Sequence, residues 1–323
     1  MKRRGVIFGG ALVAAGLAIL GYLLVPWYAG GPFDEDTNFI VPQGSSLASV
    51  ADKMEEEGLL SSASGFLLRA KILGGNAPIK AGEFAFPAGA SPSHLLGLMQ
   101  DGDVINRQIT IPEGLPSILV HERLMANPLL TGEIEIPEEG SILPQTYSFE
   151  RGENRADVIR RMQTAMQRVL HEAWEKRAPD LVVTSPEEAL TLASIVEKET
   201  AKPSERRMVA GLYSNRLKQG IRLQADPTII YPITKGKPLG RRIKQSEIDA
   251  VNAYNTYSMA GLPRGPITNP GRASIEAVLN PEATDAVYMV ADGTGGHVFA
   301  STYEEHRDNV EKWFAIRRER GEL

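Results

Sequence analysis

The amino terminus begins with an unbroken apolar run. Residues 5–33 carry no charge, and their apolar part, residues 5–28, spans about 36 Å as a helix, against about 30 Å for the hydrocarbon core of a bilayer. A cleaved signal peptide usually has an apolar stretch of only about 7–15 residues. We therefore expect one uncleaved transmembrane helix, with the Trp and Tyr of residues 25–28 in an aromatic belt at the membrane interface.

Three basic residues at positions 2–4 precede this run. The positive-inside rule predicts that they stay in the cytoplasm, so that the chain from about Asp34 onward lies on the other side of the membrane. The sequence thus predicts a single-pass protein of the inner (cytoplasmic) membrane whose carboxyl-terminal part is periplasmic or otherwise extracytoplasmic.

Residues 34–112 alternate between short extended runs and amphipathic helices. A strand over 39–41 precedes a helix that begins after Ser45 or Ser46 and ends at Gly58, because its apolar residues recur at i, i+3, i+4 and i+7. The further predicted elements are a helix over 63–73, an extended segment over 83–86, a helix that begins at Pro92 and a strand over 104–111. This order indicates a small α/β module, which either binds a ligand or serves only as a spacer.

A larger, mostly helical domain follows a boundary at residues 111–114. A long helix is predicted over 155–177, where Met162 and Met166 share the apolar face and are expected in the core. A strand and turn are predicted over 288–293. The predicted fold class is α+β, divided into a cytoplasmic stub and anchor (1–33), a small module (34–112) and a large mixed α+β domain (113–323).

Composition excludes several classes of function. The 323 residues include 40 acidic and 35 basic side chains, for a formal net charge of -5, so the positive surface that nucleic-acid binding requires is not expected. The absence of cysteine excludes disulfides, thiolate metal sites and cysteine nucleophiles, and only five histidines are available as ligands. We therefore expect no metal, no cofactor and no nucleic-acid partner.

The strongest chemical signal lies at the end of a predicted buried helix. Ser185 is placed to cap this helix, and residues 189–196 are too apolar to face water. Glu199 continues the apolar stripe that begins at Leu192, whereas Glu197 lies about 160° around the helix from it. The two glutamates are therefore expected in different environments. Apolar surroundings disfavour a charged carboxyl and raise its pKa, so Glu199 is the candidate general acid.

Three other segments offer side chains that suit a sugar-binding cleft around one carboxyl. They cover residues 215–231, residues 253–271, and residues 288–299 with His297. Proline and glycine restrict the backbone of the second segment, so it presents polar groups at little entropic cost. The candidate sugar-binding residues are Gln224, Asp226, Thr228, Tyr254 and Asn255. Two alternatives stay open, because Asp226 can be a simple turn residue and His297 a hydrogen-bonded histidine at a strand edge.

Several short motifs follow one another in a fixed order through this domain. They are Leu-Ala-Ser-Ile-Val-Glu-Lys-Glu-Thr at 192–200, Ser-Glu-Arg at 204–206, Asn-Arg-Leu at 215–217, Leu-Gln-Ala-Asp-Pro-Thr-Ile-Ile-Tyr at 223–231, Tyr-Asn-Thr-Tyr at 254–257, Gly-Leu-Pro at 261–263 and Gly-His at 296–297. As an ordered set they resemble the endolytic murein transglycosylases of the MltG (YceG-like) family. The resemblance implies that the small module is LysM-like and that the large domain is a YceG-like catalytic domain. Gln145 departs from the pattern, since the family usually has an aspartate there, so no carboxylate role is expected at this position.

The same resemblance implies a membrane-anchored lytic transglycosylase that cleaves the MurNAc-GlcNAc β-1,4 bond inside nascent peptidoglycan strands. It assigns catalysis to the second glutamate of the Glu-Lys-Glu string, which is Glu199. Protonated Glu199 would donate to the glycosidic oxygen and then accept the proton of the C6 hydroxyl, which attacks C1 and leaves a 1,6-anhydro end. The implied partners are peptidoglycan glycan strands and peptidoglycan synthases (penicillin-binding proteins), without a metal or organic cofactor.

Three alternatives remain. A muramidase-type hydrolase would use Asp226 as a second carboxylate, either as base or as nucleophile. A non-catalytic peptidoglycan-binding scaffold of the wall-synthesis machinery would keep Glu199 only as a structural residue. A pyridoxal-phosphate aminodeoxychorismate lyase would need a lysine, but Lys198 faces away from the apolar stripe and an exported chain disfavours this activity.

Overall fold

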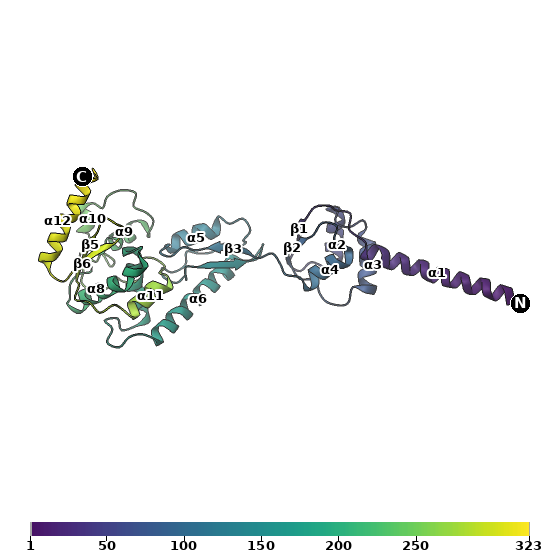
Figure 1. Cartoon of the computed structure of the whole chain (residues 1–323), viewed down its shortest axis with the longest axis horizontal. Helices are drawn as coiled ribbons and strands as arrows, with labels where there is room; N and C mark the ends of the chain where they lie inside the picture. The colour runs from purple at the N-terminus through teal and green to yellow at the C-terminus, as the bar shows by residue number, and fades with distance from the viewer. Residues whose placement is uncertain (1, 323) are drawn as a thin grey trace. The chain divides into compact units, whose positions relative to one another are not determined.

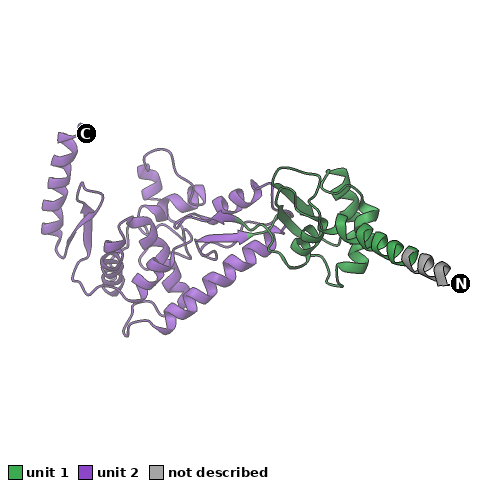
Figure 2. Cartoon of the chain, turned by 45° about the vertical axis from the view of Figure 1, so that its right-hand side comes forward, with its two compact units in different colours: residues 1–107, 149–152 green, residues 108–148, 153–323 purple. Residues whose placement is uncertain are grey.

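The computed structural model describes residues 2–322, and the chain divides into two compact units (Figure 2). Unit 1 comprises Met1–Arg107 and Phe149–Gly152, and unit 2 comprises Gln108–Ser148 and Glu153–Leu323. The side chains of residues 2–4, on which the predicted membrane orientation rests, lie outside the described residues.

Unit 1 begins with one long apolar helix, α1 (Lys2–Tyr28) (Figure 1). Its segment Ala11–Tyr28 is long and apolar enough to cross a membrane. At the end of this helix, however, Trp27 is only 1% exposed, and its ring centroid lies 5.8 Å from that of Phe66. The prediction of an interfacial belt is therefore wrong for Trp27, because its indole fills part of the core of unit 1, while Tyr28 is exposed.

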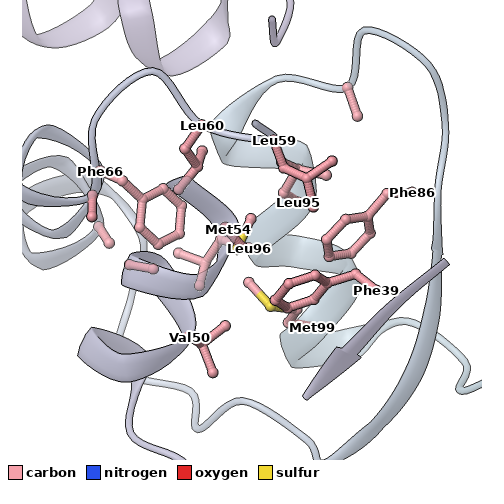
Figure 3. Close-up of a cluster of buried hydrophobic side chains, with 14 of the residues drawn as sticks. Phe39, Val50, Met54, Leu59, Leu60, Phe66, Phe86, Leu95, Leu96 and Met99 are labelled. Atoms are coloured by element: carbon pink, nitrogen blue, oxygen red, sulfur yellow. The ribbon is translucent and has the colours of Figure 1, made fainter. Parts of the chain in front are cut away.

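The rest of unit 1 packs three helices around a two-stranded antiparallel sheet. The elements are β1 (Thr37–Val41), α2 (Leu47–Glu56), α3 (Ala63–Leu73), β2 (Gly82–Phe86) and α4 (Pro92–Asp101). Ser46, Ser62 and Ser91 each accept a hydrogen bond from the backbone N–H three residues later, which sets where the helices begin. The core of this unit (Figure 3) includes Phe39, Val50, Met54, Leu59, Leu60, Phe66, Phe86, Leu95, Leu96 and Met99.

Unit 2 is mostly helical, with the two-stranded sheet β5–β6 and most of the two-stranded sheet β3–β4. Its helices are α5 (Ser117–Met125), α6 (Arg155–Glu175), α7 (Pro186–Glu199), α8 (Arg206–Lys218), α9 (Pro227–Thr234), α10 (Gln245–Ile248), α11 (Arg272–Leu279) and α12 (Tyr303–Glu319), with a 3₁₀ helix η1 (Pro203–Glu205). The strands are β3 (Arg107–Thr110), β4 (Thr146–Phe149), β5 (Tyr288–Ala291) and β6 (His297–Ala300). β3 pairs with β4, and β5 pairs antiparallel with β6. The strand predicted over 104–111 is therefore present but shorter.

Helix α7 lies at the centre of unit 2. It packs against α6, α8, α9 and α11, and the residues from Leu192 to Val196 are all buried, as the apolar run predicts. Ser185 caps its first turn by accepting from the backbone N–H of Glu188. Because neighbouring helices surround α7, its last residue, Glu199, occupies a defined position in the fold. On α6, Met162 and Met166 are buried, which confirms their prediction as core residues.

Candidate active site

Glu199 combines partial exposure with surroundings that disfavour its charge. It is the last residue of α7, and its carboxyl is hydrogen-bonded to the hydroxyl of Tyr213. Burial raises the pKa of Glu199 from 4.5 to about 7; the Tyr213 hydrogen bond opposes this rise, the charge of Asp226 adds to it, and the charge of Arg216 lowers the pKa. A carboxyl with a pKa near 7 is half protonated at neutral pH, so it can donate a proton and take one back in one reaction cycle.

The side chain of Glu197, two residues earlier, is also shielded from solvent. Its side chain is 6% exposed and its carboxylate oxygen Oε1 lies 3.6 Å from a guanidinium nitrogen of Arg206. Its Oε2 accepts from the backbone N–H of Gly271 (2.9 Å) and from Ser274 Oγ (2.7 Å), at the amino-terminal end of α11. The two glutamates therefore differ in their partners and not in their burial. An arginine and a helix amino terminus satisfy Glu197, which suits a structural role.

Helix α8 supplies two functional side chains that the sequence analysis did not select. Tyr213 is fully buried, and burial together with the neighbouring Glu199 charge raises its pKa, so it remains a hydrogen-bond donor. Arg216 lies one turn later and donates from Nε to the carbonyl of Val287 (2.6 Å) and from Nη1 to that of Leu223 (2.8 Å). The Asn-Arg-Leu motif contained Arg216, and Tyr213 precedes it by three residues, so helical spacing places both on one face.

Asp226 and Gln224 are exposed beside this cluster. Asp226 stands at the amino-terminal end of α9 and accepts a 2.6 Å hydrogen bond from the hydroxyl of Tyr257. The charges of Asp226 and Glu199 both raise the pKa of Tyr257, so the segments 215–231 and 253–271 both reach the candidate acid. Gln224 has a φ of 52°, a left-handed conformation that is unusual for a residue other than glycine.

Thr228 and Asn255 occupy a different place from the one predicted. Both are 0% exposed. Asn255 donates from Nδ2 to the carbonyls of Ala250 and Ile248 (2.6 and 2.9 Å), and Thr228 Oγ1 donates to the carbonyl of Ala225 (2.6 Å). Their polar atoms are used inside the protein, so the predicted direct contact with sugar is corrected for these two residues. They hold together the segments that carry Gln224, Asp226 and Tyr254.

Tyr254 belongs to a second polar cluster. Its ring lies 4.8 Å from that of Tyr231, whose hydroxyl is hydrogen-bonded to Glu139. Glu139 also accepts from the backbone N–H of Ser117 (2.9 Å) and from Asn269 Nδ2 (3.4 Å). Burial raises the pKa of Glu139 from 4.5 to about 7, although the hydrogen bonds from Ser117 and Tyr231 oppose the rise. The sequence analysis did not select this carboxyl, because its burial and partners come from distant segments that contain Ser117, Tyr231 and Asn269.

Gln145, the departure from the family pattern, lies with Tyr147 and Arg168 at a cavity of about 680 Å³ beside α6.

Among the described side chains, no group of three or more His, Asp and Glu residues is arranged to hold a metal ion. The groups around Glu199 suit proton transfer by a carboxyl, supported by two tyrosine hydroxyls, a second carboxylate and an arginine.

Comparisons with known proteins give a consistent picture. The model of the YceG-like family matches residues 39–312. A protein of Bacillus subtilis named endolytic murein transglycosylase is 26% identical over 325 residues, covering 90% of this chain and 89% of the relative. A protein of the same name from Streptococcus pneumoniae D39 is 29% identical over 320 residues, and the aligned part covers 84% of this chain but only 57% of that relative. The crystal structure of a YceG-like protein from Listeria monocytogenes matches with a TM-score of 0.53 and 27% identity, over 85% of this chain and 98% of that one.

Proposed function

The chain belongs to the YceG-like family, and we propose that it is an endolytic murein transglycosylase, a lyase that cleaves peptidoglycan glycan strands internally. The observation that carries the proposal is the environment of Glu199, whose burial raises its pKa to about 7 beside Asp226 and Arg216. The relatives of this name support the reaction type, and Glu199 supplies the acid that the reaction needs.

In the proposed reaction, protonated Glu199 donates its proton to the oxygen that links MurNAc C1 to the next GlcNAc. The C1–O bond breaks, and positive charge develops at C1 as in other glycoside cleavages. The resulting Glu199 carboxylate takes the proton of the C6 hydroxyl, whose oxygen attacks C1 and closes a 1,6-anhydro ring. No water is consumed, and Glu199 ends the cycle protonated. Because the nucleophile belongs to the same sugar, proximity lowers the barrier without a second carboxylate.

The surrounding residues then have distinct roles. Gln224, Asp226 and Tyr254 are proposed to contact the sugar, since all three residues are exposed or partly exposed. Thr228 and Asn255 are proposed to position those residues from inside the protein. Tyr213 and Arg216 are proposed to set the protonation of Glu199, because both lower a pKa that burial raises.

A muramidase-type hydrolase is the second candidate, because the charge of Asp226 raises the pKa of Glu199. In that reaction Asp226 would serve as nucleophile or would activate water, and the product would have a reducing end. The hydrogen bond from Tyr257 occupies one carboxylate oxygen of Asp226, which favours a binding role for Asp226 over a nucleophilic one.

The membrane anchor, the small module and the protein partners are also proposed. Helix α1 would serve as an uncleaved single-pass anchor, with the carboxyl-terminal part of the chain outside the cytoplasm. An intact amino terminus in the mature protein would support this. Residues 34–112 would form a LysM-like glycan-binding module, supported by the β1, α2, α3, β2 order with an antiparallel strand pair. The catalytic domain would span 113–323. Peptidoglycan synthases (penicillin-binding proteins) are the proposed partners at the site of strand synthesis.

The proposed activity is tested by the release of soluble fragments from purified sacculi. Glu199→Gln keeps the shape of the side chain and removes the transferable proton, so it should abolish release. Glu175→Gln changes an exposed glutamate on α6 and serves as the matched control, with the native rate expected. Native release by Glu199→Gln would refute the assignment, and binding without release by the wild type would favour the scaffold alternative.

A further inference from the structure

Glu205 and His297 form a partly buried pair outside the proposed reaction chemistry. Glu205 ends the 3₁₀ helix η1, and His297 begins β6, so the two residues are 92 positions apart. The carboxylate accepts from His297 twice, at Oε1 from the backbone N–H (3.1 Å) and at Oε2 from ring nitrogen Nδ1 (2.8 Å). The two side chains are only 14% and 19% exposed. Burial raises the pKa of Glu205, but the hydrogen bonds from His297 outweigh it, so the pKa is lowered and the carboxylate stays ionised.

The pair is connected directly to the end of α7. Thr200 follows Glu199 in the chain, and its hydroxyl donates to Glu205 Oε2 (3.3 Å) and accepts from the backbone N–H of Lys202 (3.1 Å). Thr200 is also the residue that closes α7, with its backbone N–H directed at the carbonyl of Val196. The position of Glu205 therefore determines the position of the residue next to the candidate acid.

The turn between β5 and β6 approaches the same point closely. Lys202 Nζ lies 3.7 Å from Asp292 Oδ2, which ties the turn to the segment after α7. Gly296 has an ordinary φ, but a Cβ atom there would lie 2.2 Å from Glu205 Oε1 and 2.3 Å from Lys202 Nζ. A larger residue at this position would displace the ends of the Glu205 and Lys202 side chains, so glycine permits the close approach of the two segments.

The β5–β6 hairpin reaches the surroundings of Glu199 by a second route. The carbonyl of Val287 accepts from Arg216 Nε, and the guanidinium carbon of Arg216 lies 5.6 Å from the ring centroid of Tyr288. Arg216 in turn lowers the pKa of Glu199. One hairpin therefore contacts both Glu205, which binds the residue after the acid, and Arg216, which lowers the pKa of the acid.

We propose that Glu205 and His297 are positioning residues, which hold the β5–β6 hairpin on the end of α7 and so keep Thr200, Arg216 and Glu199 in their reactive arrangement. This inference rests on the proposed transglycosylase function for its effect on turnover. A misplacement of about 1 Å at a reacting group can cost about 100-fold in rate, so the effect belongs in kcat and not in substrate binding.

The test compares the full-length protein, in detergent, as wild type, His297→Ala, His297→Asn and the control His171→Ala, which changes an exposed histidine on α6. On sacculi, His297→Ala should lower kcat about 10- to 100-fold with KM within about 2-fold. His297→Asn places an amide N–H near the position of Nδ1 and should recover most of the lost kcat. Thr200→Val removes both hydrogen bonds of the hydroxyl but leaves the Glu205–His297 pair in place. It should show a smaller loss in the same direction and covers the case in which His297→Ala does not fold.

Hydrogen–deuterium exchange supplies a readout that does not depend on the reaction. Peptides covering residues 197–206 should exchange faster in His297→Ala than in wild type or His171→Ala. An inactive wild type would refute the proposed function, while the exchange data would still test the positioning role. Native kcat and unchanged exchange in a folded His297→Ala protein would overturn the inference, as would a loss of kcat that His297→Asn does not recover.

Discussion

Replacing Glu199 by Gln should stabilise the folded protein in a pH-dependent way. In the folded chain the pKa of Glu199 is about 7, raised from 4.5 mainly by burial. Between these two values the folded state binds a proton that the unfolded state has released, so the stability from this group is fully present below 4.5 and lost as pH rises through 7. The Gln variant has no such group, and its stability therefore lacks this dependence.

The size of the effect follows from the two pKa values. Each unit of difference corresponds to about 1.36 kcal/mol, so wild type should lose about 3 kcal/mol relative to Glu199→Gln between pH 4.5 and pH 8. This is an upper value, because Glu199 is partly exposed and solvent screens its charge. Glu139 also titrates near pH 7, but it is present in both proteins and its contribution cancels.

Urea denaturation at pH 5 and pH 8, followed by tryptophan fluorescence, measures this difference. Trp174 and Trp313 report on unit 2, and only the transition of unit 2 should move between the variants. Glu175→Gln is the matched control and should differ from wild type by a constant amount at both pH values. A free-energy difference between wild type and Glu199→Gln that is the same at pH 5 and pH 8 would refute the reasoning.

Three further predictions concern the surroundings of Glu199. Tyr213→Phe removes a hydrogen bond that lowers the pKa of Glu199, so the fall of kcat/KM at alkaline pH should move to higher pH. Asp226→Asn removes a charge that raises this pKa, so the fall should move to lower pH, and an unmoved profile in both variants would contradict the proposed acid. Asn255→Ala leaves buried backbone carbonyls unpaired and should lower the free energy of unfolding by about 2–4 kcal/mol, measured in urea.

Features that depend on local sequence were predictable. Ser46, Ser91 and Ser185 cap helices where their side chains and the following apolar stripe indicated. The apolar stripe of α7 also identified Glu199 as a carboxyl in unfavourable surroundings for its charge, and the raised pKa confirms that part of the prediction. Capping and helical periodicity act over a few residues, so a single sequence contains the necessary information.

Features that depend on distant segments were not predictable. The helical wheel separated Glu197 from the apolar stripe, but it could not show that α11, about 75 residues later, covers Glu197 and satisfies it. Trp27 reads as an interfacial residue of a membrane helix, yet its ring packs on Phe66 of a later helix. Helical periodicity describes one face of one element, and contacts between elements decide which polar groups are buried.

The polar residues of the candidate site show the same limit. Thr228 and Asn255 have side chains that suit sugar recognition, and nothing local distinguishes them from exposed Gln224 and Asp226. Only the fold shows that Thr228 is hydrogen-bonded to Thr256 and that Asn255 is enclosed by backbone carbonyls. Residue type therefore indicated the chemistry of the site, and burial decided which residues can contact a ligand.

Mass spectrometry of the products tests the central claim most directly. Intact sacculi are incubated with wild type, Glu199→Gln and Glu175→Gln, and the ends of the released glycans are compared. The proposed mechanism predicts 1,6-anhydro ends, lighter by one water than reducing ends, from wild type and Glu175→Gln, and no new ends from Glu199→Gln. Reducing ends from wild type, or anhydro ends from Glu199→Gln at the native rate, would contradict it.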